Sequence, residues 1–174
     1  MLKINHTSFN KNIFKAFDEG KPILTVGSYN DFNAMTVSWG GVGVLWNMDV
    51  AFVFIRPTRY THEFSEKYDS FTLSFLGDKY QDAKILFGTK SGKDIDKFNE
   101  TKLHPTFEPD FNGYYIAEAD YVIRMKKMMK LSFTEDNLPK EVFSCYPKKD
   151  FHDVYICKIN DILVKEELYD SFKP

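Results

Sequence analysis

The chain has 174 residues, of which 43% are hydrophobic and 17% aromatic, and this length and composition are typical of one globular domain. These values exclude intrinsic disorder, a collagen-like fibre and a miniprotein held by disulfides. The 23 basic and 25 acidic residues leave a formal net charge of -2, so no strong basic field is available to bind nucleic acid or an anionic membrane. We therefore expect a single domain over 1–174, with no nucleic acid and no membrane among its partners.

The first part of the chain predicts a helix followed by a β-hairpin. Apolar residues recur at helical spacing over 8–18, and Gly20 follows as a stop signal. The apolar segments 22–28 and 34–39 flank a group of turn residues, which predicts two antiparallel strands. The three glycines between positions 40 and 43 then predict a loop.

The middle of the chain continues as strand, helix and strand. Residues 49–55 are dense in Val, Phe and Ile and predict a strand that ends at Arg56. Thr61 is the expected N-cap of a short helix over 61–68. The alternating segment 70–76 predicts the next strand.

Two more helices and the last strands follow. Asp78 and Gln81 have capping-box spacing, which predicts a helix that Gly88 closes. One further helical turn is expected at 93–99, and loop signals surround positions 107–109 and 112–113. Long strands are predicted for 114–130, as one strand or two, and for 150–160 as a central strand with a continuation over 162–167.

Strands therefore outnumber helices, and they do not alternate with long helices as a parallel sheet requires. The fold class that we expect is mainly β, an antiparallel β-barrel with small helices.

The two cysteines, Cys145 and Cys157, have a spacing that matches no common zinc or redox motif. Free thiols indicate a reducing compartment. The first fifteen residues lack the apolar run of a signal peptide, and no apolar run approaches the ~18 residues of a membrane span. We therefore expect a cytoplasmic protein.

Several enzyme classes lack their motifs. The glycines at 40, 41 and 43 do not complete G-x-G-x-x-G, and the segment 88–94 has three residues between its glycines where a P-loop needs four. The histidines at positions 6, 62, 104 and 152 are dispersed, so we expect no metal site.

Segment 33–40 is harder to explain as plain scaffold. Thr36 and Ser38 share one face of the predicted strand and precede a glycine-rich turn. They can present hydroxyls and backbone N–H groups to an anion or a ring edge. The alternative is a strand with a solvent-facing hydroxyl surface.

Segment 55–61 places two guanidinium groups and two hydroxyl groups at a strand end, just before a helix. Arg56 and Arg59 are suited to planar recognition of a phosphate. The helix N-terminus adds oriented N–H groups and a positive partial charge. The segment predicts a phosphate site, and the alternative is two surface arginines with a capping Thr61.

In this order, five segments together resemble one known family. They are K-P-I-L-T-V-G-S, N-A-M-T-V-S-W-G-G, R-P-T-R-Y-T, S-F-T-L-S-F-L and S-G-K-D-x-D-K-F. The chain resembles, over roughly residues 20–160, the flavin reductase-like, FMN-binding split-barrel proteins, and within them the flavoredoxin-type group. The resemblance implies a Greek-key antiparallel split barrel that holds FMN, rather than FAD, without a covalent bond. It also implies a homodimer with the flavin near the subunit interface.

The resemblance assigns cofactor-binding roles to residues in four segments. Residues expected to line the isoalloxazine ring and ribityl chain are Asn33, Thr36, Val37, Ser38 and Trp39. Residues expected at the phosphate, or packed close to the flavin, are Arg56, Arg59, Tyr60 and Thr61. The family's S-G-x-D-x-x-K segment adds Ser91, Gly92, Asp94 and Lys97, and its late strand adds His152.

Four of these late positions keep a second interpretation. Ser91 and Gly92 are also compatible with an ordinary turn, and Lys97 with a solvated helix lysine. His152 either faces the site or makes a structural hydrogen bond, and the second interpretation is preferred slightly.

The function implied is that of an NAD(P)H-dependent flavin reductase-like oxidoreductase. Two alternatives remain: a flavoredoxin-like electron carrier fed by a redox protein, and a non-enzymatic ligand-binding barrel. Because a flavin carries its own redox chemistry, no acid–base pair is required in the sequence. No catalytic residue is assigned.

Overall fold

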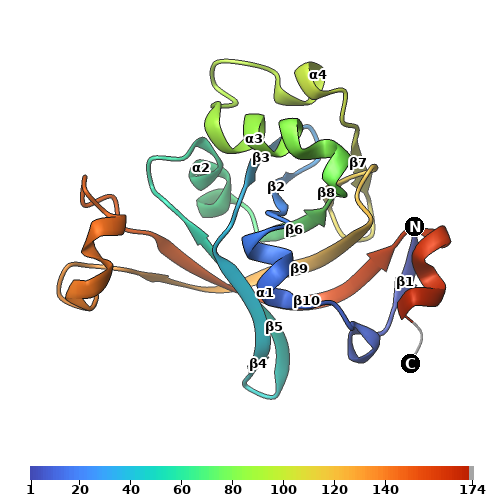
Figure 1. Ribbon diagram of the computed structural model, residues 1–174, viewed down its shortest axis with the longest axis horizontal. Helices are drawn as coiled ribbons and strands as arrows, with labels where there is room; N and C mark the ends of the chain where they lie inside the picture. The colour runs from blue at the N-terminus through green and yellow to red at the C-terminus, as the bar shows by residue number, and fades with distance from the viewer. Residues whose placement is uncertain (173–174) are drawn as a thin grey trace.

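The computed structural model describes residues 1–172, which form mostly antiparallel β-structure with small helices (Figure 1). The strands of this part of the chain are β1 (Leu2–Ile4), β2 (Ile23–Ser28), β3 (Asp31–Thr36), β4 (Gly40–Leu45), β5 (Met48–Ile55), β6 (Ser70–Phe75), β7 (Pro105–Glu108), β8 (Gly113–Ile116), β9 (Tyr121–Ser132) and β10 (Asp153–Val164). The α-helices are α1 (Ile13–Asp18), α2 (Tyr60–Lys67), α3 (Gln81–Thr89) and α4 (Lys97–Thr101). Short 3-10 helices are η1 (His6–Ser8), η2 (Asp78–Tyr80), η3 (Lys140–Cys145) and η4 (Glu166–Phe172). Within 1–172, no helix is both long enough and apolar enough to cross a membrane.

Eight strands form one sheet, in which β3, β2, β6, β9, β10, β5 and β4 follow one another and β1 pairs with β10. Every strand pairing is antiparallel. β7 and β8 form a separate hairpin. The antiparallel β fold with small helices that we expected is therefore confirmed, and β10 lies between β5 and β9 as a central strand.

The two ends of this sheet meet at one short link. β3 and β4 are the end strands of the path, yet they are consecutive in the chain and only residues 37–39 separate them. A link of this length spans at most about 14 Å. The sheet must therefore curl until its two ends lie close together. The link 37–39 lies where the curled sheet remains open.

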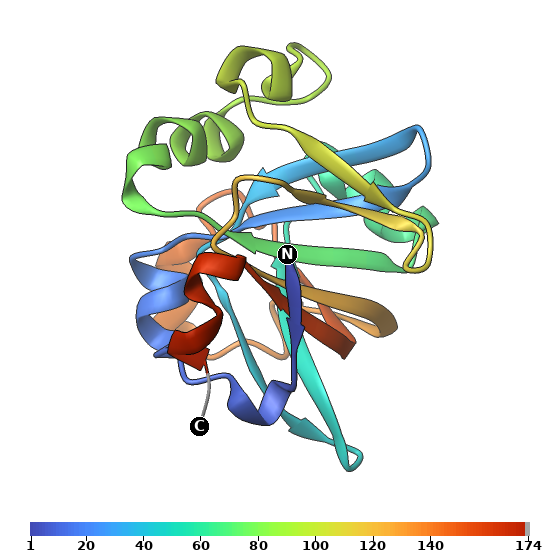
Figure 2. The ribbon, with the colours of Figure 1, turned by 90° about the vertical axis from the view of Figure 1, so that its right-hand side faces the viewer.

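The buried residues form two cores because β2 is covered on both faces. Leu24 and Val26 point into the main core. Ile23 points the other way, into a second core with Phe87 of α3. This follows from the two-residue period of a strand. Figure 2 shows α3 and α4 over the β2–β3 part of the sheet, so these helices flank the sheet end that carries the link.

The predicted loop at the glycines near position 40 is wrong. Residues Gly40–Leu45 form β4 and pair with β5. A Cβ added at Gly40 would lie 2.3 Å from a ring carbon of Phe17. Glycine is needed there because α1 packs directly on the strand. Local propensity indicated a turn, and tertiary pairing overrode it.

The predicted hairpin of β2 and β3 is present with different bounds. Asn30 has a left-handed φ of 58° and shortens the turn, so β3 begins at Asp31 and not at Ala34. β3 ends at Thr36, and Ser38 and Trp39 lie outside it. Thr36 and Ser38 therefore do not share a strand face.

The predicted helix starts are also corrected. α2 begins at Tyr60, and its N-cap residue Arg59 makes no side-chain cap bond. Thr61 does not cap the helix, because its hydroxyl accepts a hydrogen bond from the amide of Asn33. At α3 the expected capping box is absent: the turn that starts at Asp78 is a 3-10 helix. Gly88 lies inside the last turn of α3 rather than beyond it.

The other predicted helices and strands are present with shifted boundaries. The helix expected at 8–18 is α1, which starts at Ile13 with Asn12 as its cap. The turn expected at 93–99 becomes α4, capped by Asp96. The long segment 114–130 divides into β8 and β9, and the loop signals at 107–109 fall partly within β7. β10 extends to Val164, so the continuation expected at 162–167 is confirmed in part.

Candidate functional site

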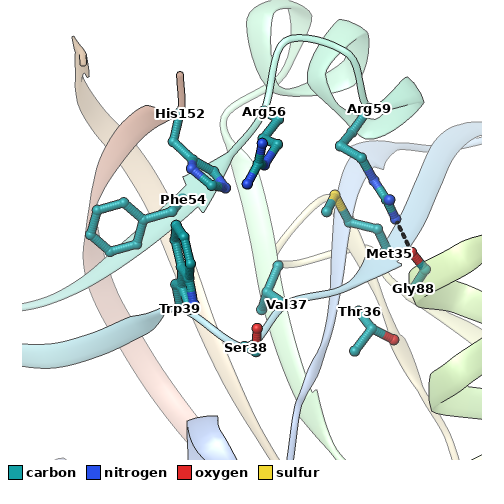
Figure 3. Close-up of a pocket in the computed structure, with 10 residues that line it drawn as sticks. All are labelled: Met35, Thr36, Val37, Ser38, Trp39, Phe54, Arg56, Arg59, Gly88 and His152. Carbon is teal, nitrogen blue, oxygen red and sulfur yellow. Dashed lines mark hydrogen bonds between the residues drawn. The ribbon is translucent and has the colours of Figure 1, made fainter. Parts of the chain in front are cut away.

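A cavity of about 250 Å³ opens at the link between β3 and β4 (Figure 3). The link, the end of β5, the start of α2, the end of α3 and the start of β10 all contribute to it. Its lining residues are Met35, Thr36, Val37, Ser38, Trp39, Phe54, Arg56, Arg59, Gly88 and His152. Seven of these were predicted as site residues. Met35, Phe54 and Gly88 were not: Met35 and Phe54 resemble ordinary strand residues in the sequence, and Gly88 was predicted only to end a helix.

One wall of this cavity is aromatic. The Trp39 and His152 rings lie 4.8 Å apart, and Phe54 is beside them (Figure 3). His152 Nδ1 is 2.8 Å from the hydroxyl of Tyr146, so its ring is fixed from behind. Burial, with a smaller contribution from Arg56, lowers the pKa of His152 to about 4. The imidazole is therefore neutral at neutral pH. The preferred structural hydrogen bond of His152 is present, and the ring also faces the cavity.

The link residues contribute backbone groups more than hydroxyls. The Thr36 hydroxyl donates to the Lys84 carbonyl of α3 at 2.6 Å and is turned away from the cavity centre. The Val37 N–H donates to the Pro22 carbonyl at 3.0 Å. Ser38 and Trp39 lie between the two strands, outside the β-ladders. Their N–H groups are the donors that the link offers to a ligand.

Arg56 already has an anionic partner. Its Nη1 lies 2.7 Å from Asp150 Oδ1, and its Nη2 donates to the Cys145 carbonyl at 2.9 Å. The guanidinium also lies 5.0 Å from the ring centre of Tyr146. Arg56 thus attaches the segment between β9 and β10 to the cavity wall, and its charge is largely neutralised.

Arg59 is in a different electrostatic state. It is partly buried, and Nη2 donates to the Gly88 carbonyl at 2.7 Å (Figure 3). Burial, together with the neighbouring Arg56, lowers the pKa of Arg59. Among residues 1–172 it makes no ion pair with a carboxylate. Its charge is therefore available to an external anion.

Lys97 also makes no ion pair within the described chain, and with Arg59 it lines an adjoining cavity of about 100 Å³. It is 4% exposed, and its ammonium donates to the Ala34 carbonyl. Burial first, and then Arg59, lowers the pKa of Lys97 to about 8. No carboxylate of the described chain pairs with it. A buried cation, Lys97, and a partly buried one, Arg59, thus border one cavity and repel each other. Burial of unpaired charge is costly unless an anion neutralises it.

The other predicted residues complete this second cavity. Asn33 donates to the hydroxyl of Thr61 at 2.8 Å and joins β3 to α2. A Cβ at Gly92 would lie 2.3 Å from Asn33 Oδ1, so only glycine permits this approach. Tyr60 and Ser91 line the same cavity. Asp94 does not line it and faces a third cavity beyond Gly92.

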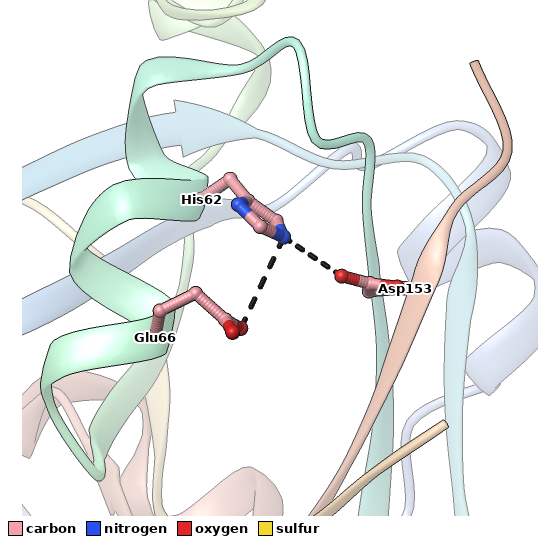
Figure 4. Close-up of side chains that lie close together, drawn as sticks. All are labelled: His62, Glu66 and Asp153. Atoms are coloured by element: carbon pink, nitrogen blue, oxygen red, sulfur yellow. Dashed lines mark hydrogen bonds and ion pairs between the residues drawn. The ribbon is translucent and has the colours of Figure 1, made fainter. Parts of the chain in front are cut away.

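Behind the site, His62 and Glu66 of α2 converge with Asp153 of β10 (Figure 4). His62 Nε2 is 2.7 Å from Asp153 Oδ2 and 3.9 Å from Glu66 Oε1. Lys130 of β9 lies 2.7 Å from Glu66 and 3.5 Å from Asp153. This network connects α2 to the central strand. The scattered histidine positions gave no sign of it, because it forms only when β9, β10 and α2 pack together.

A family model decides the classification. The model of the flavin reductase like domain matches residues 14–172. The chain belongs to this family. Its members are flavin-binding oxidoreductases, so the family resemblance predicted from the five segments is confirmed. No curated protein matches the chain.

Solved structures of this flavin reductase-like family share the fold. Flavoredoxin from Methanosarcina acetivorans superposes with a TM-score of 0.71 at 17% identity, over 100% of this chain and 80% of that one. An FMN-binding protein from Thermus thermophilus superposes with a TM-score of 0.68 at 18% identity, over 89% of this chain and 76% of that one. The NADH:FAD oxidoreductase of Streptomyces globisporus superposes with a TM-score of 0.65 at 14% identity, over 84% of this chain and 75% of that one. The shared fold is the split barrel, as expected.

Proposed function

We propose that this flavin reductase-like protein binds FMN without a covalent bond across the first two cavities. The flavin ring lies against the wall of Trp39, His152 and Phe54, and the phosphate lies between Arg59 and Lys97. The observation that carries the proposal is the buried Lys97 and the partly buried Arg59, both without acidic partners in the described chain, next to a cavity with an aromatic wall. A phosphate supplies the negative charge that these cations lack.

The remaining site residues orient the ligand. The N–H groups of Ser38 and Trp39 are donors for the polar edge of the ring. Asn33 and Thr61 hold β3 against α2, and both residues line the phosphate cavity together with Arg59 and Lys97. Arg56 keeps the segment around Tyr146 against the aromatic wall.

When bound, FMN supplies the hydride and electron chemistry by itself. The protein needs no acid–base pair for this, and the neutral His152 fits a role in packing and orientation. We propose that the protein is an NAD(P)H-dependent flavin reductase. The neighbouring structures of a flavoredoxin and of an NADH:FAD oxidoreductase support redox use of the site.

The test is a visible absorption spectrum of the purified protein, repeated after anaerobic addition of NADH and then NADPH. Flavin bands that bleach with either nucleotide support the reductase. Flavin bands that neither nucleotide bleaches would instead indicate a carrier that a redox protein reduces. A colourless protein that takes up no added FMN would contradict the proposal and leave a non-enzymatic barrel.

We further propose one domain, a homodimer and a cytoplasmic location. The β4–β5 hairpin projects from the sheet and exposes Val44 and Trp46 near its tip, which supports self-association (Figure 1). Cys145 is an exposed free thiol, and Cys157 is a buried one. Free thiols support a reducing compartment.

The pH dependence of FMN binding tests the role of Lys97. Only the protonated ammonium of Lys97 attracts the phosphate. Because the pKa of Lys97 is about 8, the affinity for FMN falls as the pH rises through that value. Between about pH 7 and about pH 9 we expect FMN affinity to fall up to about tenfold. Fluorescence titrations measure this, with riboflavin, which has no phosphate, as the pH-independent control. The same pH slope for FMN in Lys97→Met would contradict the assignment.

A further inference from the structure

The side chains of His62, Glu66 and Asp153 point toward one another in a cluster that the proposed function does not use (Figure 4). His62 and Glu66 are one helical turn apart on α2, so they share a face of the helix. Asp153 is the first residue of β10 and meets them from the central strand. One imidazole nitrogen and one oxygen of each carboxylate lie within 4.8 Å of one another. The helix and the strand thus bring together three atoms of the kind that ligate metals.

Further hydrogen bonds hold these side chains in place. The hydroxyl of Tyr155 donates to Glu66 Oε1 at 2.6 Å. Burial raises the pKa of Asp153, but hydrogen bonds from Ser132 and His62 outweigh this effect, so the pKa lies below its usual value. Asp153 is therefore ionised at neutral pH, and in their 2.7 Å contact His62 Nε2–H donates to its carboxylate. Partners of this kind behind the ligands orient them in metal sites.

The charge of the cluster is only partly balanced. Lys130 of β9 lies 2.7 Å from Glu66 Oε2 and 3.5 Å from Asp153 Oδ2. Two carboxylates thus share one ammonium, whereas a divalent cation balances them in full. The Lys130 side chain is 36% exposed, so its ammonium can turn into solvent and leave the carboxylates to a metal ion.

The set of ligand atoms selects the metal. An imidazole nitrogen with two carboxylate oxygens suits Zn²⁺, whereas Mg²⁺ and Ca²⁺ prefer oxygen ligands alone. Three protein ligands leave the fourth position of a tetrahedral ion to water. Such an ion, with bonds of about 2.1 Å, separates its ligand atoms by about 3.4 Å, so side-chain shifts of about 1 Å complete the geometry. Binding through Nε2 moves the proton of the neutral His62 imidazole to Nδ1.

We propose that His62, Glu66 and Asp153 form a Zn²⁺ site that joins α2 to β10, with the ammonium of Lys130 as the competing cation. None of the three ligands lines either flavin cavity, so the proposal does not rest on the flavin site. Because the ligands come from two elements that only the folded chain brings together, bound Zn²⁺ stabilises the fold.

The test is calorimetric titration of Zn²⁺ into the purified protein after treatment with a chelator, with the melting temperature followed in parallel. One Zn²⁺ per chain is expected. His62→Asn and Glu66→Gln are each expected to weaken binding by at least about 100-fold, since residues that only orient a ligand already contribute about 10- to 100-fold. Lys130→Met is expected to strengthen binding by about tenfold, because it removes a competing positive charge. Zn²⁺ is expected to raise the melting temperature of the wild type and not that of Glu66→Gln.

His104→Asn is the matched control. His104 Nδ1 lies 2.6 Å from Glu118 Oε1, but no third ligand from the described residues joins this pair. The Zn²⁺ affinity of His104→Asn is therefore expected to equal that of the wild type. Because Glu66 is exposed, Glu66→Gln is expected to keep the fold, which circular dichroism checks.

The contrary outcomes are distinct. Absence of Zn²⁺ binding, or equal affinity in the wild type, His62→Asn and Glu66→Gln, overturns the site and leaves the cluster as an ion-pair network. Mg²⁺ binding as tight as that of Zn²⁺ overturns the choice of metal. Weaker Zn²⁺ binding in Lys130→Met overturns the role of Lys130 as a competitor. FMN titrations of the same variants test the flavin site separately.

Discussion

Replacing Arg59 with methionine is expected to weaken FMN binding by about 10- to 100-fold, because a charge-assisted hydrogen bond contributes roughly 1.5–3 kcal/mol. Arg59 is partly buried, lines both flavin cavities and pairs with no carboxylate of the described chain. Its charge is therefore uncompensated until a phosphate binds. Methionine retains much of the apolar stem, so the loss reports the charge rather than the packing. Fluorescence titration with FMN measures it.

Arg56→Met is the matched control for Arg59→Met. Both arginines line the first cavity, but Arg56 is neutralised by Asp150 at 2.7 Å. We expect a smaller loss of FMN affinity in Arg56→Met than in Arg59→Met. Riboflavin lacks the phosphate, so its affinity is expected to be unchanged in Arg59→Met. In Arg56→Met any loss is expected to be the same for FMN and riboflavin, because Arg56 supports the aromatic wall and not the phosphate. An equal loss for FMN and riboflavin in Arg59→Met would show that the ring site, and not a phosphate contact, had been damaged.

Replacing Arg124 with methionine is expected to lower the free energy of unfolding by about 3–5 kcal/mol. Arg124 of β9 and Asp161 of β10 are 6% and 5% exposed and pair through two bonds of 2.6 and 2.7 Å. The substitution leaves the buried Asp161 carboxylate with only the exposed Lys3 as a partner. Urea unfolding followed by circular dichroism measures the change.

Two further variants show whether this loss comes from uncompensated charge. Lys165→Met removes the more exposed ion pair with Asp120 and is expected to cost less than about 1 kcal/mol. The double variant Arg124→Met with Asp161→Leu removes both charges and is expected to recover much of the stability. A double variant as unstable as Arg124→Met would contradict the electrostatic explanation and indicate lost packing.

Much of the candidate site could be predicted from the sequence because its residues lie where strands end and helices begin. Gly-rich and Arg-Pro segments mark such ends locally, and the family resemblance assigned them to a flavin. Asn33, Arg59 and Lys97 belong to three such segments, and in the structure they border one cavity. That they bind the flavin remains a prediction.

The charge state of these residues could not be predicted from the sequence. Arg56 and Arg59 are equivalent in the pattern R-P-T-R, yet Asp150, 94 positions beyond Arg56, neutralises only the first. Lys97 has the sequence context of a solvated helix lysine and is nevertheless buried. Burial and pairing depend on which distant segments pack together, and no local pattern encodes that.

The sequence by itself determined the antiparallel β class, the position of most strands and the family, because alternation and turn chemistry are local properties. Only the tertiary structure decided that Gly40–Leu45 is a strand, since an edge strand is stabilised by its neighbour β5 and not by its own propensity. The closure of the sheet at residues 37–39 likewise depends on the whole order of strands. This closure brings the link, the two arginines and Lys97 around the same two cavities. It therefore leaves Lys97 and the partly buried Arg59 without an acidic partner in the described chain.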